Sequence, residues 1–317
     1  GSRDLPYHAG FLPLLPLLTV LLASVPALMR LPAQVVIFLA AAHAVWGVVA
    51  ADEERAAAVT GMVTAGREVG NWAAIRLNES EALATDTAGA VAYASARRTL
   101  SLRPGYYLPP PASDLPPPAN RAEAVLQARP EIVVFRDPLH SHRPLTAADR
   151  ELFDHPLFRF FYAPRRERLA EGSTVHYFAL DRRDLELWPV AWQGDEDRVS
   201  DLVAAAVERW QKEPPPAPAD SPEGVALHRQ LEEAHAAAER GERDRVIDIL
   251  EAVHQRNQTA RVAGIPAAIG GIAARIEHLP LAIQGFKDQA RLDPTSRVRH
   301  THLRMFLRIK PEDLKQQ

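Results

Sequence analysis

The chain opens with two long apolar runs separated by a single charged residue. Residues 11–29 and residues 31–51 contain no formally charged side chain, and Arg30 lies between them. A helix rises about 1.5 Å per residue, so each run is about long enough to cross a hydrocarbon core of about 30 Å. The pattern predicts a transmembrane helical hairpin over residues 1–52, with Arg30 in the turn. The alternative is a buried helical pair in a large soluble core, which needs apolar partners on all sides.

Charges beside these runs predict how the hairpin is oriented. Arg30 lies in the turn, whereas the second run ends at Asp52, Glu53 and Glu54. By the positive-inside rule, the turn faces the cytoplasm, and the residues after 51 lie on the extracytoplasmic or periplasmic side of the inner membrane. Prolines inside the first run favour other transmembrane helices as partners, besides membrane lipid, because neighbouring helices satisfy the carbonyl groups that proline leaves free.

From residue 53 the pattern changes to helices that alternate with short strands. Apolar positions at helical spacing predict a helix over residues 56–76. The other predicted elements are strands at 81–87, 99–102 and 131–136, helices at 88–97, 120–128 and 145–153, and a closing hairpin of 158–162 with 174–181. Alternation of this kind predicts an extracytoplasmic α/β domain over residues 53–211.

A proline-rich segment separates this domain from a helical tail. Residues 212–222 (KEPPPAPADSP) have the composition of a stiff, extended linker. In residues 223–317, apolar stripes predict helices at 224–240, 243–255, 265–276, 279–292 and 295–308. The tail resembles tetratricopeptide repeats, and its better-matched unit contains Ala282, Phe286 and Ala290. Such repeats either bind a protein partner or form a helical cap that stabilises the α/β domain.

Composition narrows the possible classes of function. The chain has 317 residues, no cysteine, a formal net charge of -3 and a mean hydropathy of -0.18. The near-neutral charge argues against a nucleic-acid partner bound through bulk positive charge. Without cysteine there are no disulfides, thiolate metal sites or iron–sulfur clusters. The sequence also lacks nucleotide-binding glycine patterns and the G-x-S-x-G nucleophile elbow, so we expect no cofactor.

Candidate binding residues follow the predicted strands of the α/β domain. Asp86 ends a strand shortly before Gly89, where α/β folds place ligand contacts, although a helix N-cap explains Asp86 equally well. Arg103, Tyr106 and Tyr107 begin a proline-rich loop. That loop is either a wall for a sugar or lipid headgroup or a plain connector.

Several histidines carry side chains of the metal-ligand type. Asp137, His140, His142 and His155 lie within one stretch of the α/β domain. No helical or strand spacing brings their nitrogen atoms together, and prolines interrupt the segment. We therefore expect no metal site there.

A series of short motifs follows the second apolar run. The first is a helix with Gly70-Asn71-Trp72, and the second is a short strand with Leu83-Ala84-Thr85. An acidic turn of residues 86–93 follows, and then a segment of small residues and arginine, Ser95-Ala96-Arg97-Arg98. Together with residues 7–16, they resemble the C-terminal part of polytopic membrane glycosyltransferases, which take sugars from polyprenyl-phosphate donors. The resemblance covers roughly residues 7–190. It implies that the α/β domain supports a lipid-linked sugar site, whose candidate contacts are Asp86, Tyr93, Arg103, Tyr106 and Tyr107.

The chain also departs from that class. Its members carry the catalytic acid on the first extracytoplasmic loop, after the first of many membrane helices. This chain has two predicted membrane helices and no such loop, so no catalytic carboxylate is assigned. We expect the C-terminal portion or a non-catalytic relative of such an enzyme. The alternative is a membrane-anchored assembly protein whose α/β domain and helical repeats bind partners in a larger complex.

Overall fold

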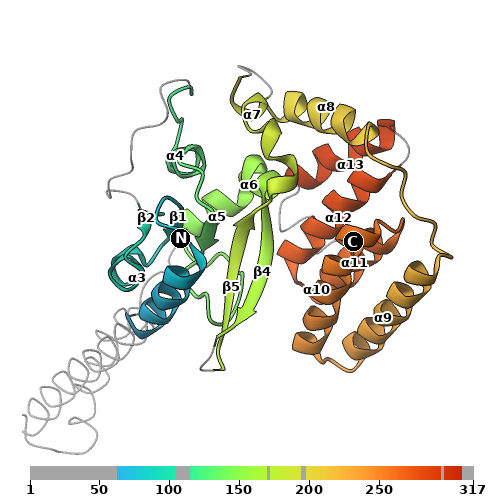
Figure 1. Ribbon diagram of the computed structural model, residues 1–317, viewed down its shortest axis with the longest axis horizontal. Helices are drawn as coiled ribbons and strands as arrows, with labels where there is room; N and C mark the ends of the chain where they lie inside the picture. The colour runs from blue at the N-terminus through green and yellow to red at the C-terminus, as the bar shows by residue number, and fades with distance from the viewer. Residues whose placement is uncertain (1–62, 104–114, 170–171, 194–197, 294–295, 309–317) are drawn as a thin grey trace, which may run out of the picture. The chain divides into compact units, whose positions relative to one another are not determined.

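The structure is a computed structural model that describes residues 63–103, 115–169, 172–193, 198–293 and 296–308 (Figure 1). The predicted transmembrane hairpin, residues 1–52, lies outside these described residues. Within them, no helix combines the length and the apolar character needed to cross a membrane. The residues from 69 onward belong to one compact unit of mixed α/β content.

A sheet of five strands, in the order β2-β1-β3-β5-β4, forms the centre of the α/β domain. β1 (Ala82–Thr85) pairs in parallel with β2 (Arg98–Ser101) on one side and with β3 (Ile132–Val134) on the other. β5 (Thr174–Leu180) pairs antiparallel with β3 and forms a hairpin with β4 (Tyr162–Arg168). One half of the sheet is therefore parallel, and the other half is a hairpin, which confirms the predicted α/β character.

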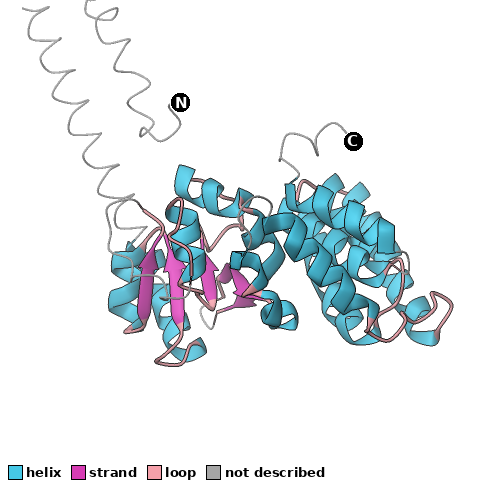
Figure 2. Cartoon of the chain, turned by 90° about the horizontal axis from the view of Figure 1, so that it is seen from above, coloured by secondary structure: helices cyan, strands magenta, loops and turns pink. Residues whose placement is uncertain are grey.

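Helices cover both faces of this sheet (Figure 2). On one face, Leu83, Ile132 and Val175 pack against the helix of residues 63–76 and against α3 (Ala88–Ser95). On the other face, neighbouring strand residues such as Ala84, Val133 and Phe178 pack against helices that follow later in the chain. These helices are α4 (Arg121–Gln127), α5 (Ala147–Asp154), α6 (Pro156–Phe161) and α8 (Arg198–Gln211). Burial on both faces explains why the central strands β1 (ALAT) and β3 (IVV) are almost continuously apolar.

Helix α6 corrects one prediction. We expected a strand at residues 158–162, but Pro156–Phe161 is helical and β4 begins only at Tyr162. The Nδ1 atom of His155 accepts a hydrogen bond from the Leu157 main-chain N–H at 3.3 Å, and Pro156 occupies the first turn. Both features start helices. A short run whose residues are all buried fits a strand and a helix equally well, so here the start signals decide.

Residues 182–211 contain elements that the sequence pattern did not predict. They are the 3-10 helix η3 (Arg182–Leu187), α7 (Val190–Gln193) and α8. In α8, the buried residues Leu202, Ala206 and Trp210 recur every four positions. That spacing is a helical signal that the sequence contained.

The helical tail forms two packed pairs and a final helix. α9 (Pro222–Glu239) packs against α10 (Arg243–Ala260), and α11 (Ile265–Arg275) packs against α12 (Leu279–Leu292). α13 (Ser296–Arg308) follows and contacts α12. These helices confirm the helices predicted for the tail, and α9–α12 enclose an apolar core of their own.

The tail and the α/β domain also share a hydrophobic core. Ile283 and Ala290 of α12 and Leu303 and Leu307 of α13 belong to the same buried cluster as Phe160 of α6. Within the segment predicted to be a linker, the Ala217 N–H donates to the Arg261 carbonyl oxygen at 2.9 Å, and the Ala263 N–H donates back to Ala217 at 3.1 Å. The tail is therefore fixed against the sheet.

Candidate functional site

Two predicted residues meet where adjacent parallel strands end. Asp86 directly follows β1, and Arg103 lies two residues beyond β2, which is its neighbour in the sheet. The Arg103 Nε donates to Asp86 Oδ1 at 2.7 Å, and Nη2 donates to Oδ2 at 3.3 Å. The Asp86 side chain is only 1% exposed, whereas that of Arg103 is 42% exposed. The pair therefore leaves part of the Arg103 side chain accessible at the surface.

This position has a further significance in the sheet. The chain passes from β1 to β2 on one side and then returns to β3 on the other side of β1. In α/β sheets, ligands bind outside the carboxyl ends of the strands where the strand order reverses in this way, which here is between β1 and β3. Asp86 at the end of β1 borders this point, and Arg103 lies on the β2 side of Asp86. The alternative role of Asp86 as a helix N-cap is wrong, because Thr87 is the N-cap residue of α3 and makes no side-chain cap bond. Asp86 is held by Arg103 instead.

A second buried carboxylate, which the sequence analysis did not select, lies near this pair. Asp149 Oδ2 accepts hydrogen bonds from the main-chain N–H groups of Leu145 and Thr146, each at 3.2 Å, and so closes the capping box of α5. Burial raises the pKa of Asp149, and the charge of Asp86 raises it further. The signal that precedes it, Thr146 followed three residues later by an acidic residue, is a helix-start pattern and carries no hint of a binding site.

Tyr93, a further candidate contact, is 87% exposed on α3. Tyr106 and Tyr107 lie outside the described residues. The structure thus places Asp86 and Arg103 together, and leaves Tyr93 as an exposed aromatic residue.

Other residues of the glycosyltransferase-like motifs have packing roles. A Cβ atom on Gly70 would lie 2.5 Å from the Ala94 Cβ, so the glycine lets the helix of residues 63–76 approach α3 closely. Arg97 Nε donates to the Leu77 carbonyl oxygen at 3.0 Å, and Nη2 donates to the Ala74 carbonyl oxygen at 2.9 Å. Arg97 therefore satisfies carbonyl groups at the end of that helix, as cationic residues commonly do.

The histidines with metal-ligand side chains are spread over separate positions. His140 pairs with Asp137 at 2.6 Å on the surface, His142 is buried, and His155 caps α6. Across the part of the chain that the structure describes, no group of three or more histidines and carboxylates has a geometry suited to a metal ion.

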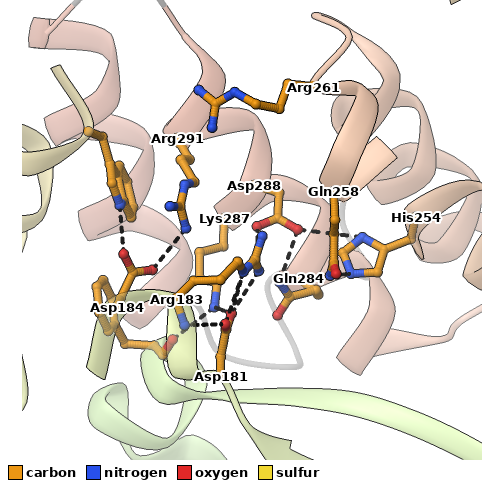
Figure 3. A network of polar contacts seen from close by, with 12 residues as sticks. Asp181, Arg183, Asp184, His254, Gln258, Arg261, Gln284, Lys287, Asp288 and Arg291 are labelled. Carbon is orange, nitrogen blue, oxygen red and sulfur yellow. Dashed lines mark hydrogen bonds and ion pairs between the residues drawn. The ribbon is translucent and has the colours of Figure 1, made fainter. Parts of the chain in front are cut away.

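A larger polar site lies where the tail packs against the α/β domain (Figure 3). At its centre, Lys287 Nζ in α12 donates to the Phe160 carbonyl oxygen at 2.8 Å and lies 3.3 Å from Asp181 Oδ2. Asp181, the residue after β5, also accepts from Arg183 Nη2 at 2.7 Å. Burial opposes the charge on Asp181, but Lys287 and Arg183 together hold its pKa well below the ordinary value. We call the connected set of buried and half-buried charges around this contact the polar joint; its members are Asp181, Arg183, Asp184, Glu213, Lys287, Asp288 and Arg291.

On one side, the polar joint continues into the tail. Arg183 Nη2 donates to Asp288 Oδ1 at 3.1 Å, and Gln284 donates to the other oxygen of Asp288 at 3.0 Å. His254 Nδ1 lies 3.4 Å from Asp288, while its Nε2 lies 3.0 Å from the Gln258 amide nitrogen. Burial lowers the pKa of His254 to about 4, despite the nearby Asp288 carboxylate. The imidazole is therefore neutral at pH 7.

On the other side, the polar joint ties in the proline-rich segment. Asp184 of η3 accepts from Trp210 Nε1 at 2.9 Å and from Arg291 Nη1 at 3.3 Å. Glu213 forms ion pairs with Arg291 and with Arg261, the latter at 2.5 Å. One set of paired charges thus holds together η3, α8, the proline-rich segment and α12.

A small cleft, partly open to solvent, lies beside the polar joint. It is lined by Arg183, His254, Asn257, Gln258, Arg261, Pro266, Asp288 and Leu292. None of these side chains is a hydroxyl or thiol nucleophile, and Arg183, Asp288 and Arg261 are already engaged in ion pairs. The ion pairs of the cleft and of the polar joint therefore hold the α/β domain and the tail together. The Asp86–Arg103 pair differs in its position at the carboxyl ends of β1 and β2, with an Arg103 side chain that is 42% exposed.

Comparison with known proteins assigns no function to either site. The chain matches no protein-family model, no curated protein and no solved structure.

Proposed function

We propose that this chain is the C-terminal portion, or a non-catalytic relative, of a membrane glycosyltransferase, and that its α/β domain holds the headgroup of a lipid-linked sugar. The observation that carries the proposal is the Asp86–Arg103 ion pair at the carboxyl ends of β1 and β2. Residues 1–52 are proposed to anchor the domain as a transmembrane hairpin, with the domain on the extracytoplasmic side.

The chemistry of the pair suits a sugar phosphate. A guanidinium group is a permanent cation that attracts phosphate oxygens, and Asp86 holds Arg103 in a fixed orientation through Nε and Nη2. Gly89, in the first turn of α3, leaves open space, because a Cβ atom there would meet nothing within 4 Å.

Binding of a short polyprenyl phosphate tests this proposal. The full chain in detergent micelles is titrated with farnesyl phosphate by calorimetry, and Arg103→Gln is expected to weaken binding at least tenfold. Arg103→Lys keeps the charge but loses the paired donors, so it is expected to give an intermediate affinity. The matched control is Arg98→Gln, since Arg98 is exposed on the same strand β2.

Thermal unfolding of each variant separates loss of binding from loss of fold. The proposal is wrong if folded Arg103→Gln binds farnesyl phosphate as well as the parent chain does. It is equally wrong if Arg98→Gln weakens binding as much as Arg103→Gln.

The polar joint favours a second candidate function, that of an assembly protein. The shared core and the buried ion pairs fix α9–α12 against the sheet, so the tetratricopeptide-like tail is a rigid surface suited to a protein partner. Val225 on α9 is 51% exposed and is a suitable position for a photo-crosslinking residue. In native membranes, a crosslinked product of one defined mass, together with no binding of farnesyl phosphate, would favour assembly over headgroup binding.

A further inference from the structure

Three histidines meet where the tail packs against the sheet. His142 lies in the loop after β3, His176 is in β5, and His278 immediately precedes α12. The ring centroids of His142 and His176 are 5.0 Å apart, and those of His142 and His278 are 5.6 Å apart, both in edge-to-face geometry. His142 and His278 are buried and His176 is half-buried. The cluster therefore joins three segments that are distant in sequence.

The His142 ring is held by hydrogen bonds to two main-chain carbonyl groups. His142 Nε2 lies 2.7 Å from the Arg165 carbonyl oxygen and 3.1 Å from that of Tyr177. Because carbonyl oxygens only accept, Nε2 carries the proton, which leaves Nδ1 unprotonated in the neutral ring. Within the described residues, this Nδ1 is buried without a hydrogen-bond partner, and so is Nδ1 of His176.

His278 has a different task. Its Nδ1 accepts a hydrogen bond from the Leu281 main-chain N–H at 3.3 Å and so caps the N-terminus of α12. A proton on this atom removes the acceptor and places positive charge at the positive end of the helix dipole. Protonation of His278 is thus unfavourable for two reasons, besides burial.

The charges around the cluster give little compensation for added protons. Arg166 in β4 is already paired with Asp248 and Glu251 of α10, and Arg243 of α10 repels a proton on His278. Within the described residues, the charged and titratable groups that act on the three rings or pair with those that do are Asp137 and His140 from the loop, Arg165 and Arg166 from β4, and Arg243, Asp244, Asp248 and Glu251 from α10. Among them, Asp137 and Asp244 attract a proton to His176. Burial nevertheless lowers the pKa of His176 and of His278 to about 4, and that of His142 well below its ordinary value.

We propose that His142, His176 and His278 form an acid-sensitive latch between the sheet and the helical tail. At neutral pH the uncharged rings pack together and cap α12. When acid protonates them, three positive charges share a buried space beside Arg166 and Arg243, and the first turn of α12 separates from β5.

Hydrogen exchange of the full chain in detergent micelles tests the latch. After correction for the intrinsic pH dependence of exchange, amides in the first turn of α12 and in β5 are expected to exchange at least tenfold faster at pH 5.0 than at pH 7.5. The change reverses when the pH is restored. His278→Asn keeps a capping side chain but cannot take up a proton in this range, so the acceleration should be at least threefold smaller than in the parent chain, with His142 and His176 still able to respond. His228→Asn, an exposed histidine on α9, should leave the acceleration unchanged.

Two results would overturn the latch: equal exchange at both pH values, or an undiminished acceleration in His278→Asn. A titration of the imidazole C–H resonances of the unmodified chain provides a readout that needs no variant. Rings that take up protons at or above pH 6.5 without any change in α12 exchange would also contradict the proposal.

Discussion

The ammonium group of Lys287 donates a hydrogen bond to the main-chain carbonyl oxygen of Phe160 at 2.8 Å, although 127 residues separate the two positions. Only 3% of the Lys287 side chain is exposed. A cation buried this deeply persists only when it is paired and hydrogen-bonded, and Asp181 supplies the opposite charge. The contact therefore fixes one position of α12 against α6.

Replacement of Lys287 by methionine should destabilise the protein strongly. The substitution leaves the Phe160 carbonyl oxygen without this donor, and leaves Asp181 with Arg183 as its remaining charged partner. We expect the free energy of unfolding in urea to fall by about 3 kcal/mol, the lower end of the range for breaking a buried ion pair. Lys212→Met is the control, because Lys212 pairs with Glu208 on the surface and is 73% exposed. It should change stability by less than about 0.5 kcal/mol, and equal losses in both variants would refute a special role for Lys287.

Two glycines in the tail should respond in opposite ways to alanine. A Cβ atom on Gly285 would lie 2.7 Å from the Gly270 nitrogen and 2.8 Å from the Pro266 carbonyl oxygen, all main-chain atoms that yield little. Gly285→Ala should therefore lower the free energy of unfolding by about 1–3 kcal/mol. Gly271 in α11 has no atom within 4 Å of such a Cβ, so Gly271→Ala should raise it by about 0.5–1 kcal/mol. A stabilising Gly285→Ala would show that α11 and α12 do not approach as closely as described.

Helix caps give a second matched pair. The Thr146 hydroxyl accepts from the Asp149 N–H at 3.0 Å, so Thr146→Ala should cost about 1 kcal/mol in a urea melt. Thr87 is the N-cap residue of α3 but makes no side-chain cap bond. Thr87→Ala should accordingly cost only a few tenths of a kcal/mol. If the two variants lost the same free energy of unfolding, the capping box of α5 would make no contribution to stability.

Stability should fall as the solution becomes acidic. The pKa values of His254 and His278 are lowered to about 4 in the folded protein, against about 6.5 in an unfolded chain. Between these values the unfolded chain binds more protons, so each histidine lowers the free energy of unfolding by about 1.4 kcal/mol per pH unit as the pH falls. Asp181 and Asp288, whose pKa values are held below their ordinary range, add to the loss below about pH 4.

Urea unfolding at pH 7.5, 6.0 and 5.0 measures this slope. His254→Gln keeps a hydrogen-bonding side chain and should reduce the slope, whereas the exposed-site variant His228→Asn should preserve it. A free energy of unfolding that stays constant or rises between pH 7.5 and 5.0 would contradict the neutral state of the buried rings.

Local signals in the sequence predicted most of the secondary structure. The strand at residues 131–136 and the tail helices followed from apolar spacing, and the start of α5 followed from Thr146. The error at residues 158–162 arose because five consecutive buried residues carry no periodicity. For α8, the periodicity was present in Leu202, Ala206 and Trp210 but was not used.

The sites were predictable to different degrees. Asp86 and Arg103 both follow strands, so their proximity depends only on β1 and β2 being neighbours in a parallel sheet. The polar joint had no such signal. Asp181 and Lys287 lie 106 residues apart, and each resembles an ordinary surface charge until the tail packs against the sheet. Tyr93 was selected by motif position alone, and the helix turns it outward.

The shared core also sets an order of events during synthesis. Leu303 and Leu307 of α13 fill the same cluster as the aromatic residues of α6, and Arg159 Nη1 reaches the Leu307 carbonyl oxygen at 3.5 Å across 148 residues. A nascent α/β domain that has just left the ribosome therefore lacks part of its interior, and its apolar face stays open until residue 307 emerges. Contacts over such long loops form slowly, and the exposed face is prone to aggregation in the meantime. A chaperone that covers α6 during this interval would therefore protect the nascent chain from an aggregation risk that follows from its topology.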